Sequence, residues 1–126
     1  MAAQAPQRLT VRLLPSTTAK APANATTMIR HLVLLKFTDE ATVERRDSLS
    51  AAFARLATQI PEVRSLEWGP NASPEGLNKG FTHCFLVTFQ DEAARDAYLP
   101  HPAHLAFVGE LKPWLADVLV VDYELP

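Results

Sequence analysis

The chain has 126 residues and a formal net charge of −2, with ordinary apolar and charged fractions. This length suits one domain with its own hydrophobic core, and the balanced charge gives no reason to expect a nucleic-acid partner. The longest apolar runs, Leu32–Leu35 and Val118–Val121, are too short to span a bilayer, so we expect no membrane segment.

Residues 1–27 read as an extension to that domain. They are rich in Ala, Thr and Pro, include two arginines, and contain no acidic or aromatic residue. Such a composition is typical of a disordered tail and also of a transit peptide. Met28, just before the first clear strand, leaves a later translation start open as well. We therefore place the domain at residues 28–126 and expect a cytoplasmic protein, or an organellar one if the extension is a targeting signal.

Ile29–Phe37 is the first predicted strand. Its alternation places His31 with Ile29 and Val33 on one face, which we assign to the helices, whereas Leu32 and Leu34 lie on the other. A strand that is apolar on both faces needs a cover on each side. In so short a chain, the second cover could be another subunit, so the pattern predicts a homodimer.

A long helix and a short strand follow. The helix is expected to start at Thr38–Glu40, to continue to about Gln59 and to end before Pro61. Its buried stripe consists of Leu49, Ala52, Phe53, Leu56 and Ile60. Val63–Trp68 is the second predicted strand, with a turn at residues 69–71.

The remaining elements complete a known pattern. Phe81–Phe89 alternates as a third strand, and Val118–Tyr123 is the last strand. Between them we expect two helices, one that starts at Asp91 and ends near Tyr98 and one that begins at Pro102. The order β-α-β-β-α-β, with the second helix broken in two, is the ferredoxin-like α+β pattern. It predicts an antiparallel sheet with helices on one face.

The helix break carries the main candidate site. Pro100 favours an end of the earlier helix near Tyr98, and Pro102 suits the first helical position, with His101 before it as the cap. On the new helix, the inward face is predicted to comprise His104, Phe107, Val108 and Leu111. A histidine on an apolar face must either find a hydrogen-bond partner or act on something in a pocket.

Each histidine therefore has two interpretations. His104 could be a general base that takes a proton next to a carbonyl, with Tyr98 as hydrogen-bond donor, or a core histidine bonded to Tyr98. His31 could line a pocket or simply pack. We interpret His83 as a strand residue among aromatic side chains and His101 as a helix cap.

The sequence indicates no cofactor and no metal. It has no glycine-rich phosphate loop, and His101 and His104 lack a nearby third ligand. Cys84 is the single cysteine, which rules out an intrachain disulfide and is compatible with a reducing compartment. Its strand face offers no adjacent base that would make it a nucleophile.

Several segments resemble one known family. They are Ile29–Phe37, Trp68-Gly69, Gly80–His83, Asp96–Tyr98, His101-Pro102-Ala103-His104 and Val121–Tyr123. Because these segments occur together in this order and spacing, the chain resembles the stress-responsive α/β-barrel (Dabb) domains. The resemblance covers about residues 28–124. The resemblance implies a ferredoxin-like domain that forms a dimeric α/β barrel.

The resemblance also implies an activity. Within the family, the chain is similar to a plant polyketide cyclase that closes a linear polyketide by an intramolecular aldol condensation. His104 matches its general base, Tyr98 its supporting tyrosine, and His31 a histidine on its first strand. The implied function is a cofactor-free cyclase or lyase for a small poly-carbonyl or phenolic substrate.

Two alternatives stay open. One is a non-catalytic stress-responsive dimer that binds a small apolar ligand, and the other is a cofactor-independent monooxygenase. An open cavity that reaches both Tyr98 and His104 would favour an enzyme. A pocket filled by Phe53 and Phe107 would favour the non-catalytic dimer.

Overall fold

The computed structural model describes residues 27–126, and the predictions made for residues 1–26 lie outside this part of the chain. Its elements are β1 (Ile29–Phe37), α1 (Val43–Gln59), β2 (Val63–Pro70), β3 (His83–Phe89), α2 (Glu92–Tyr98), α3 (Pro102–Leu111), the 3₁₀ turn η2 (Lys112–Trp114) and β4 (Leu115–Glu124). The strands form one antiparallel sheet in the order β2-β3-β1-β4. The predicted ferredoxin-like fold is therefore confirmed.

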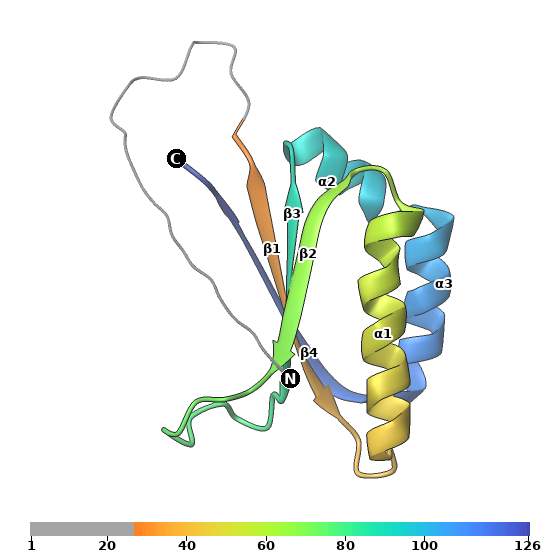
Figure 1. Cartoon of the computed structure of the whole chain (residues 1–126), viewed down its shortest axis with the longest axis vertical. Helices are drawn as coiled ribbons and strands as arrows, with labels where there is room; N and C mark the ends of the chain where they lie inside the picture. Colours follow the sequence, from red (N-terminus) through yellow and green to blue (C-terminus); the bar gives the residue numbers. More distant parts are fainter. Residues whose placement is uncertain (1–26) are drawn as a thin grey trace.

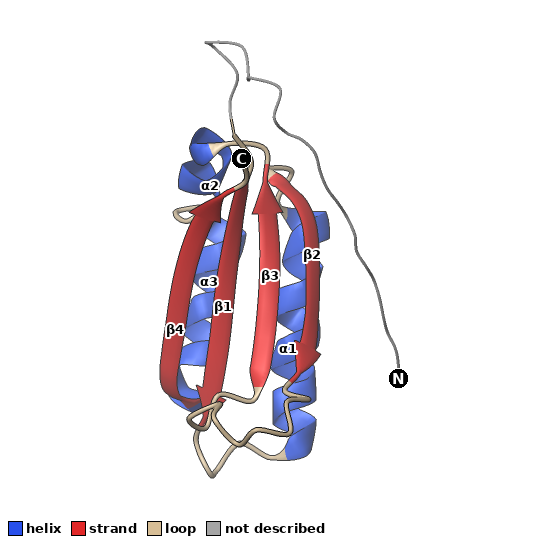
Figure 2. Ribbon diagram, turned by 90° about the vertical axis from the view of Figure 1, so that its left-hand side faces the viewer, coloured by secondary structure: helices blue, strands red, loops and turns tan. Residues whose placement is uncertain are grey.

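The molecule has two layers, a sheet and a set of helices. α1 and α3 run side by side over one face of the sheet, and α2 lies at one end of it (Figure 1). Figure 2 shows the sheet from the face opposite the helices. In this view all the helices lie behind the strands, and none of the described helices covers the near face. The two faces of β1 therefore meet different surroundings, as its alternating apolar pattern predicted.

Helix α1 closes one half of the core. Thr42 caps it, since its hydroxyl accepts a hydrogen bond of 3.1 Å from the Arg45 amide. Its stripe of Leu49, Phe53 and Leu56 is buried against the sheet. The ring of Phe53 stacks on Phe85 with centroids 4.1 Å apart. The helix ends where Ile60 turns to extended backbone before Pro61.

Two local expectations are corrected. The cap of α1 is Thr42 rather than a residue of Thr38–Glu40, because those residues form the turn that leaves β1. The second strand continues to Pro70, through the expected turn. A register shift between Val63 and Ser65 lets Val63 share the helix-facing side with Leu66 and Trp68. Because of this shift, side chains do not alternate strictly between the two faces along β2.

The outer face of the sheet is apolar at its centre. β4 pairs with β1 so that Leu119 lies beside Leu34 and Val121 beside Leu32, and Leu86 of β3 is also paired with Leu32. Leu119 and Val121 are 45% and 48% exposed. Large side chains of this kind gathered on one face are typical of an interaction surface.

In the part of the chain that is described, no helix combines the length and the apolar character that crossing a membrane would require.

Candidate functional site

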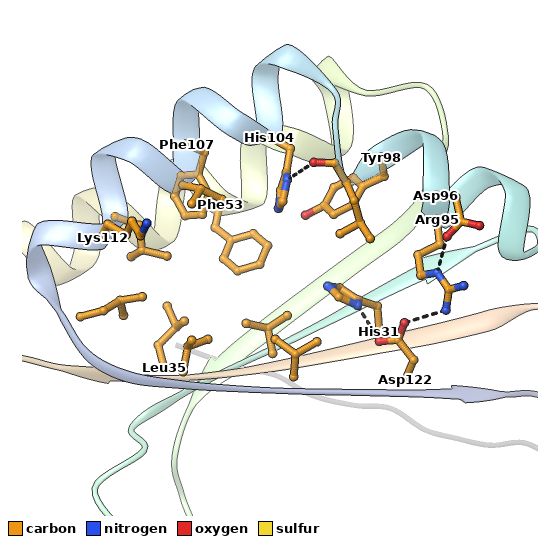
Figure 3. A pocket seen from close by; sticks show the side chains of 17 residues that line it. His31, Leu35, Phe53, Arg95, Asp96, Tyr98, His104, Phe107, Lys112 and Asp122 are labelled. Atoms are coloured by element: carbon orange, nitrogen blue, oxygen red, sulfur yellow. Dashed lines mark hydrogen bonds and ion pairs between the residues drawn. The ribbon is translucent and has the colours of Figure 1, made fainter.

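A cavity of about 670 Å³ lies between the sheet and helices α2 and α3. Apolar side chains of β1, β4 and α3 form most of its wall. Its polar lining consists of His31, Arg95, Asp96, Tyr98, His104, Lys112 and Asp122. Figure 3 shows that Lys112 lies at one end, whereas Arg95 and Asp122 lie at the other. The space is of the size and character of a pocket for a small organic ligand.

The break between α2 and α3 positions His104. As predicted, α2 ends at Tyr98, and α3 begins with Pro102 after His101, whose ring accepts a hydrogen bond from the Ala103 amide. Because the helix is interrupted here, the Leu99 carbonyl lacks a helical amide partner. It accepts a hydrogen bond of 2.8 Å from Nδ1 of His104 instead.

That hydrogen bond determines which nitrogen of His104 is free. A carbonyl oxygen can only accept, so Nδ1 carries the proton and Nε2 of the neutral ring keeps its lone pair. The ring hangs from α3 into the cavity (Figure 3). Burial lowers the pKa of His104. The hydrogen bond to the Leu99 carbonyl opposes this effect, and His31 and His101 lower the pKa further by smaller amounts. The side chain is therefore held in its neutral, basic form.

Tyr98 stands next to His104 with its ring fully buried. The two ring centroids are 4.4 Å apart. Among the described residues the Tyr98 hydroxyl has no hydrogen-bond partner, so the predicted bond between Tyr98 and His104 is absent. Burial also raises the pKa of Tyr98. The residue thus brings a protonated hydroxyl to the cavity, and a ligand oxygen could accept from it.

His31 reaches the same cavity from the sheet. Its Nδ1 lies 2.6 Å from Oδ1 of Asp122, the residue directly opposite on β4. The other oxygen of Asp122 accepts a hydrogen bond of 3.0 Å from Arg95 of α2. Arg95 also bonds Asp96 at 3.0 Å. This chain of side chains connects β1, β4 and α2 at one end of the cavity (Figure 3).

All three residues predicted as catalytic therefore lie around one cavity. His104, Tyr98 and His31 come from α3, α2 and β1, and the ring centroids of His31 and Tyr98 are 6.0 Å apart. His31 lines the cavity rather than merely packing. His83 lies elsewhere, between Phe37 and Trp68 and bonded to the Thr82 hydroxyl, which agrees with its structural interpretation.

The sequence reasoning missed Asp122 and Arg95. Asp122 shares the helix-facing side of β4 with Val118 and Val120. An acidic side chain on an otherwise apolar face was a signal that could have been followed. The pairing of Asp122 with His31 depends on the strand register, and its contact with Arg95 depends on the position of α2. Neither can be read from spacing along the chain.

Other reactive side chains contribute nothing to the site. Burial raises the pKa of Cys84, with a smaller contribution from Glu67, which disfavours the thiolate. Within residues 27–126 no cluster of three or more His, Cys, Asp or Glu side chains is arranged to hold a metal ion. The titratable groups that line the cavity are imidazole, phenol, carboxylate, guanidinium and ammonium groups.

A ferredoxin-like sheet with helices on one face and an apolar cavity beneath them defines a small α+β domain that can hold an organic ligand. The sequence of residues 29–125 matches the stress responsive A/B barrel domain, Dabb, and the chain belongs to this family.

Two curated plant proteins illustrate its range. The stress-response A/B barrel domain-containing protein HS1 of Arabidopsis thaliana is 34% identical over 76% of this chain and 88% of its own. The olivetolic acid cyclase of Cannabis sativa is 30% identical over 75% of this chain and 94% of its own.

Solved structures agree with the fold. An Arabidopsis thaliana protein superposes with a TM-score of 0.74 and 34% identity, over 78% of this chain and 95% of that one. The hydroxynitrile lyase of Passiflora edulis gives a TM-score of 0.75 and 25% identity, over 80% of this chain and 95% of that one. A protein from Thermobifida fusca, described as dimeric and ferredoxin-like, gives a TM-score of 0.68 and 28% identity, over 79% of this chain and 92% of that one. The family thus includes relatives of cyclase and lyase type.

Proposed function

We propose that this protein is a cofactor-free enzyme of cyclase or lyase type, in which Nε2 of His104 takes a proton from a carbon atom next to a carbonyl group. One observation carries the proposal. The Leu99 carbonyl holds the proton of His104 on Nδ1, so that the lone pair of Nε2 is available at a cavity large enough for an organic ligand.

The surroundings of His104 suit a base. Because burial lowers its pKa, the imidazole is neutral at physiological pH and ready to accept a proton. The Tyr98 hydroxyl also lines the cavity, has no hydrogen-bond partner among residues 27–126, and can donate to the oxygen atom on which charge develops. In an apolar cavity, a hydrogen bond to such an oxyanion is stronger than it is in water.

The cavity also indicates a substrate class. Its wall is mainly apolar, which favours an aromatic ring or an alkyl chain, and its polar groups are grouped around Tyr98, His104 and His31. A small poly-carbonyl or phenolic compound matches this division. The similarity to olivetolic acid cyclase and to a hydroxynitrile lyase supports proton-transfer chemistry at this place.

Proton abstraction can be tested with simple ketones. Acetophenone and a series of alkyl methyl ketones are incubated with the full chain in D₂O, and deuterium uptake next to the carbonyl is followed by NMR. We expect the wild type to accelerate uptake. We expect His104→Asn to slow the accelerated uptake by a factor of about 10²–10⁴, the usual contribution of a positioned general base.

The choice of variants separates catalysis from folding. His104→Asn keeps a side-chain N–H for the Leu99 carbonyl and removes only the base, so its melting temperature should stay close to that of the wild type. Tyr98→Phe removes one hydroxyl and should slow uptake with little unfolding. A wild type that binds the ketones but never accelerates uptake would leave only the non-catalytic ligand-binding dimer.

We also propose that the protein is a homodimer that buries the outer face of its sheet. The exposed apolar centre formed by Leu119, Val121 and Leu32 supports this, as do structural relatives described as dimeric. Two such faces packed together would form a closed barrel of two sheets.

Neighbouring residues of β4 provide a matched test of the dimer. Leu119→Lys would place an unpaired charge in the proposed interface and should give monomers, whereas Val118→Lys points to the cavity side and should leave the dimer intact. Sedimentation equilibrium measures both. A wild type that is monomeric at micromolar concentration contradicts the proposal.

A further inference from the structure

The cavity carries charged side chains at both of its ends. Arg95 and Asp122 lie at one end, beside His31, and Lys112 lies at the other (Figure 3). At the first end, Arg95 donates to Asp122 and to Asp96, each at 3.0 Å, so that two carboxylates share its one positive charge. Arg95 is therefore a poor partner for an anionic ligand.

Lys112 is placed differently. Within residues 27–126 the ion pairs join His31 to Asp122 and Arg95 to Asp96 and Asp122, and Lys112 takes part in none of them. Lys112 is exposed although it lines the cavity, so it lies where the cavity meets solvent. A lysine at such a mouth can attract an anion without the cost of burying either charge.

The wall between Lys112 and His104 is apolar. Phe107, Val108 and Leu111 of α3 line the cavity between the two residues. Lys112 caps this helix and follows His104 by eight positions. At a rise of about 1.5 Å per residue, the two lie about 12 Å apart along the helix axis. A ligand that reaches both needs an apolar part of about that length between two polar ends.

We infer that Lys112 is a specificity-determining residue, which binds the carboxylate of an oxo acid whose keto group lies at His104. The inference rests on the proposed function, because it names the substrate class of the same cavity. It also gives the ligand a fixed orientation along α3, which apolar contacts alone do not provide.

The charges at the two ends favour this orientation. A carboxylate beside Asp122 would meet a like charge, whereas beside Lys112 it meets an opposite one. A carboxylate also matches the charge of one lysine, while a phosphate monoester carries nearly two negative charges. The keto oxygen is then left to the Tyr98 hydroxyl, which has no hydrogen-bond partner among the described residues and can donate to it.

The first test compares charged and neutral ligands of equal length. The probes are methyl ketones with a terminal carboxylate, from levulinate to a homologue that spans about 12 Å, together with the primary amide of each. Titration of the full chain, followed by NMR, gives each Kd. We expect the longest acid to bind about twofold to fivefold more tightly than its amide, the range for an exposed ion pair. Levulinate should show no preference, because it is too short to reach both residues.

Two variants of Lys112 connect the preference to its charge. Lys112→Gln should bring the ratio of the two Kd values close to one, and Lys112→Glu should reverse it, because the acid then meets a like charge. Lys79→Gln is the matched control. Lys79 is exposed in the loop before β3, does not line the cavity, and carries the same charge.

Ionic strength provides an independent check on the same complexes. Between about 0.1 M and about 1 M salt, the screening length falls from about 10 Å to about 3 Å. We therefore expect salt to weaken the binding of the longest acid to the wild type and to leave the binding of its amide unchanged. Equal salt dependence of acid and amide would contradict an ion pair with Lys112.

The second test determines which end of the ligand lies where. Intermolecular nuclear Overhauser effects should connect the ketone methyl group of the longest acid to the rings of Tyr98 and His104. The methylene group next to the carboxylate should show such effects to the side chain of Lys112. A ligand bound the other way round, with its carboxylate beside Arg95, would overturn the inference.

The outcomes separate this inference from the proposed function, since binding and orientation are measured without turnover. If His104→Asn leaves deuterium uptake unchanged, the proposed function fails, whatever Lys112 binds. If uptake depends on His104 but Lys112→Gln has the same ratio of Kd values as the wild type, the inference about Lys112 fails alone. Tighter binding of a terminal phosphate monoester of the same length would overturn the choice of a carboxylate.

Discussion

The two halves of the layer between sheet and helices differ in how completely they are filled. Under α1, Phe85, Val87 and Phe89 of β3 are 0% exposed, and Phe53 is stacked on Phe85. Under α3, Val118 and Val120 of the edge strand β4 are 45% and 50% exposed beside a cavity of about 670 Å³.

The difference follows from the lengths and positions of the helices. α1 has 17 residues and packs its stripe of large side chains on β2 and β3. The other half is covered by α2 and α3, which have 7 and 10 residues and meet at the break around Pro100. The filled half stabilises the domain, and the half with the interrupted helix leaves room for a ligand.

The largest expected effect is on stability in the filled half. Phe85→Ala should lower the free energy of unfolding by about 3–5 kcal/mol, because the stacked rings of Phe53 and Trp68 would border a hole. Val120→Ala should change it by less than about 1 kcal/mol, since its side chain is half exposed. Urea unfolding at one fixed protein concentration measures both. Equal losses would mean that the two halves are equally packed.

Much of this contrast could be predicted from the sequence. The spacing of Leu49, Phe53 and Leu56 identified the buried stripe of α1, and Pro100 and Pro102 identified the break before His104. These features depend on local periodicity and on proline chemistry, which are properties of short segments.

The site itself was predicted only in part. His104, Tyr98 and His31 were recognised, but the bond from His104 to Leu99 was not, because it depends on a carbonyl left free by the break. Asp122 meets His31 across 91 positions of sequence. Such a pair is set by strand register, and register is a property of the assembled sheet rather than of either strand.

A smaller effect is expected from filling the cavity. Val120→Trp would extend a large ring into the space that Val120 lines, so we expect weaker binding of acetophenone by at least about tenfold, a cost of about 1.4 kcal/mol. Stability should hardly change, because the ring enters open space. Val43→Trp, at the exposed start of α1, is the control. Ligand titration by NMR measures the affinities, and unaltered binding in Val120→Trp would place the ligand elsewhere.

The smallest expected effect is a pH dependence of stability that comes from the cavity half. The pKa of His104 is lowered on folding, so the folded state binds fewer protons than the unfolded state just below the ordinary histidine value of 6.5. The contribution of His104 is therefore fully present above that value and is lost as the pH falls through 6.5 toward the lower folded value. Because the side chain is only half buried, the loss should be small.

Comparison with one variant isolates this contribution. The pKa of His83 is lowered as well, by burial and by Arg46, so the wild type alone would report both histidines. His104→Asn keeps the bond to Leu99 and removes one titrating group. Urea unfolding between about pH 8 and about pH 5 should show a steeper loss of stability in the wild type than in the variant. Parallel curves would mean that water reaches His104 freely, and that the cavity is too well hydrated to hold its imidazole in the basic form.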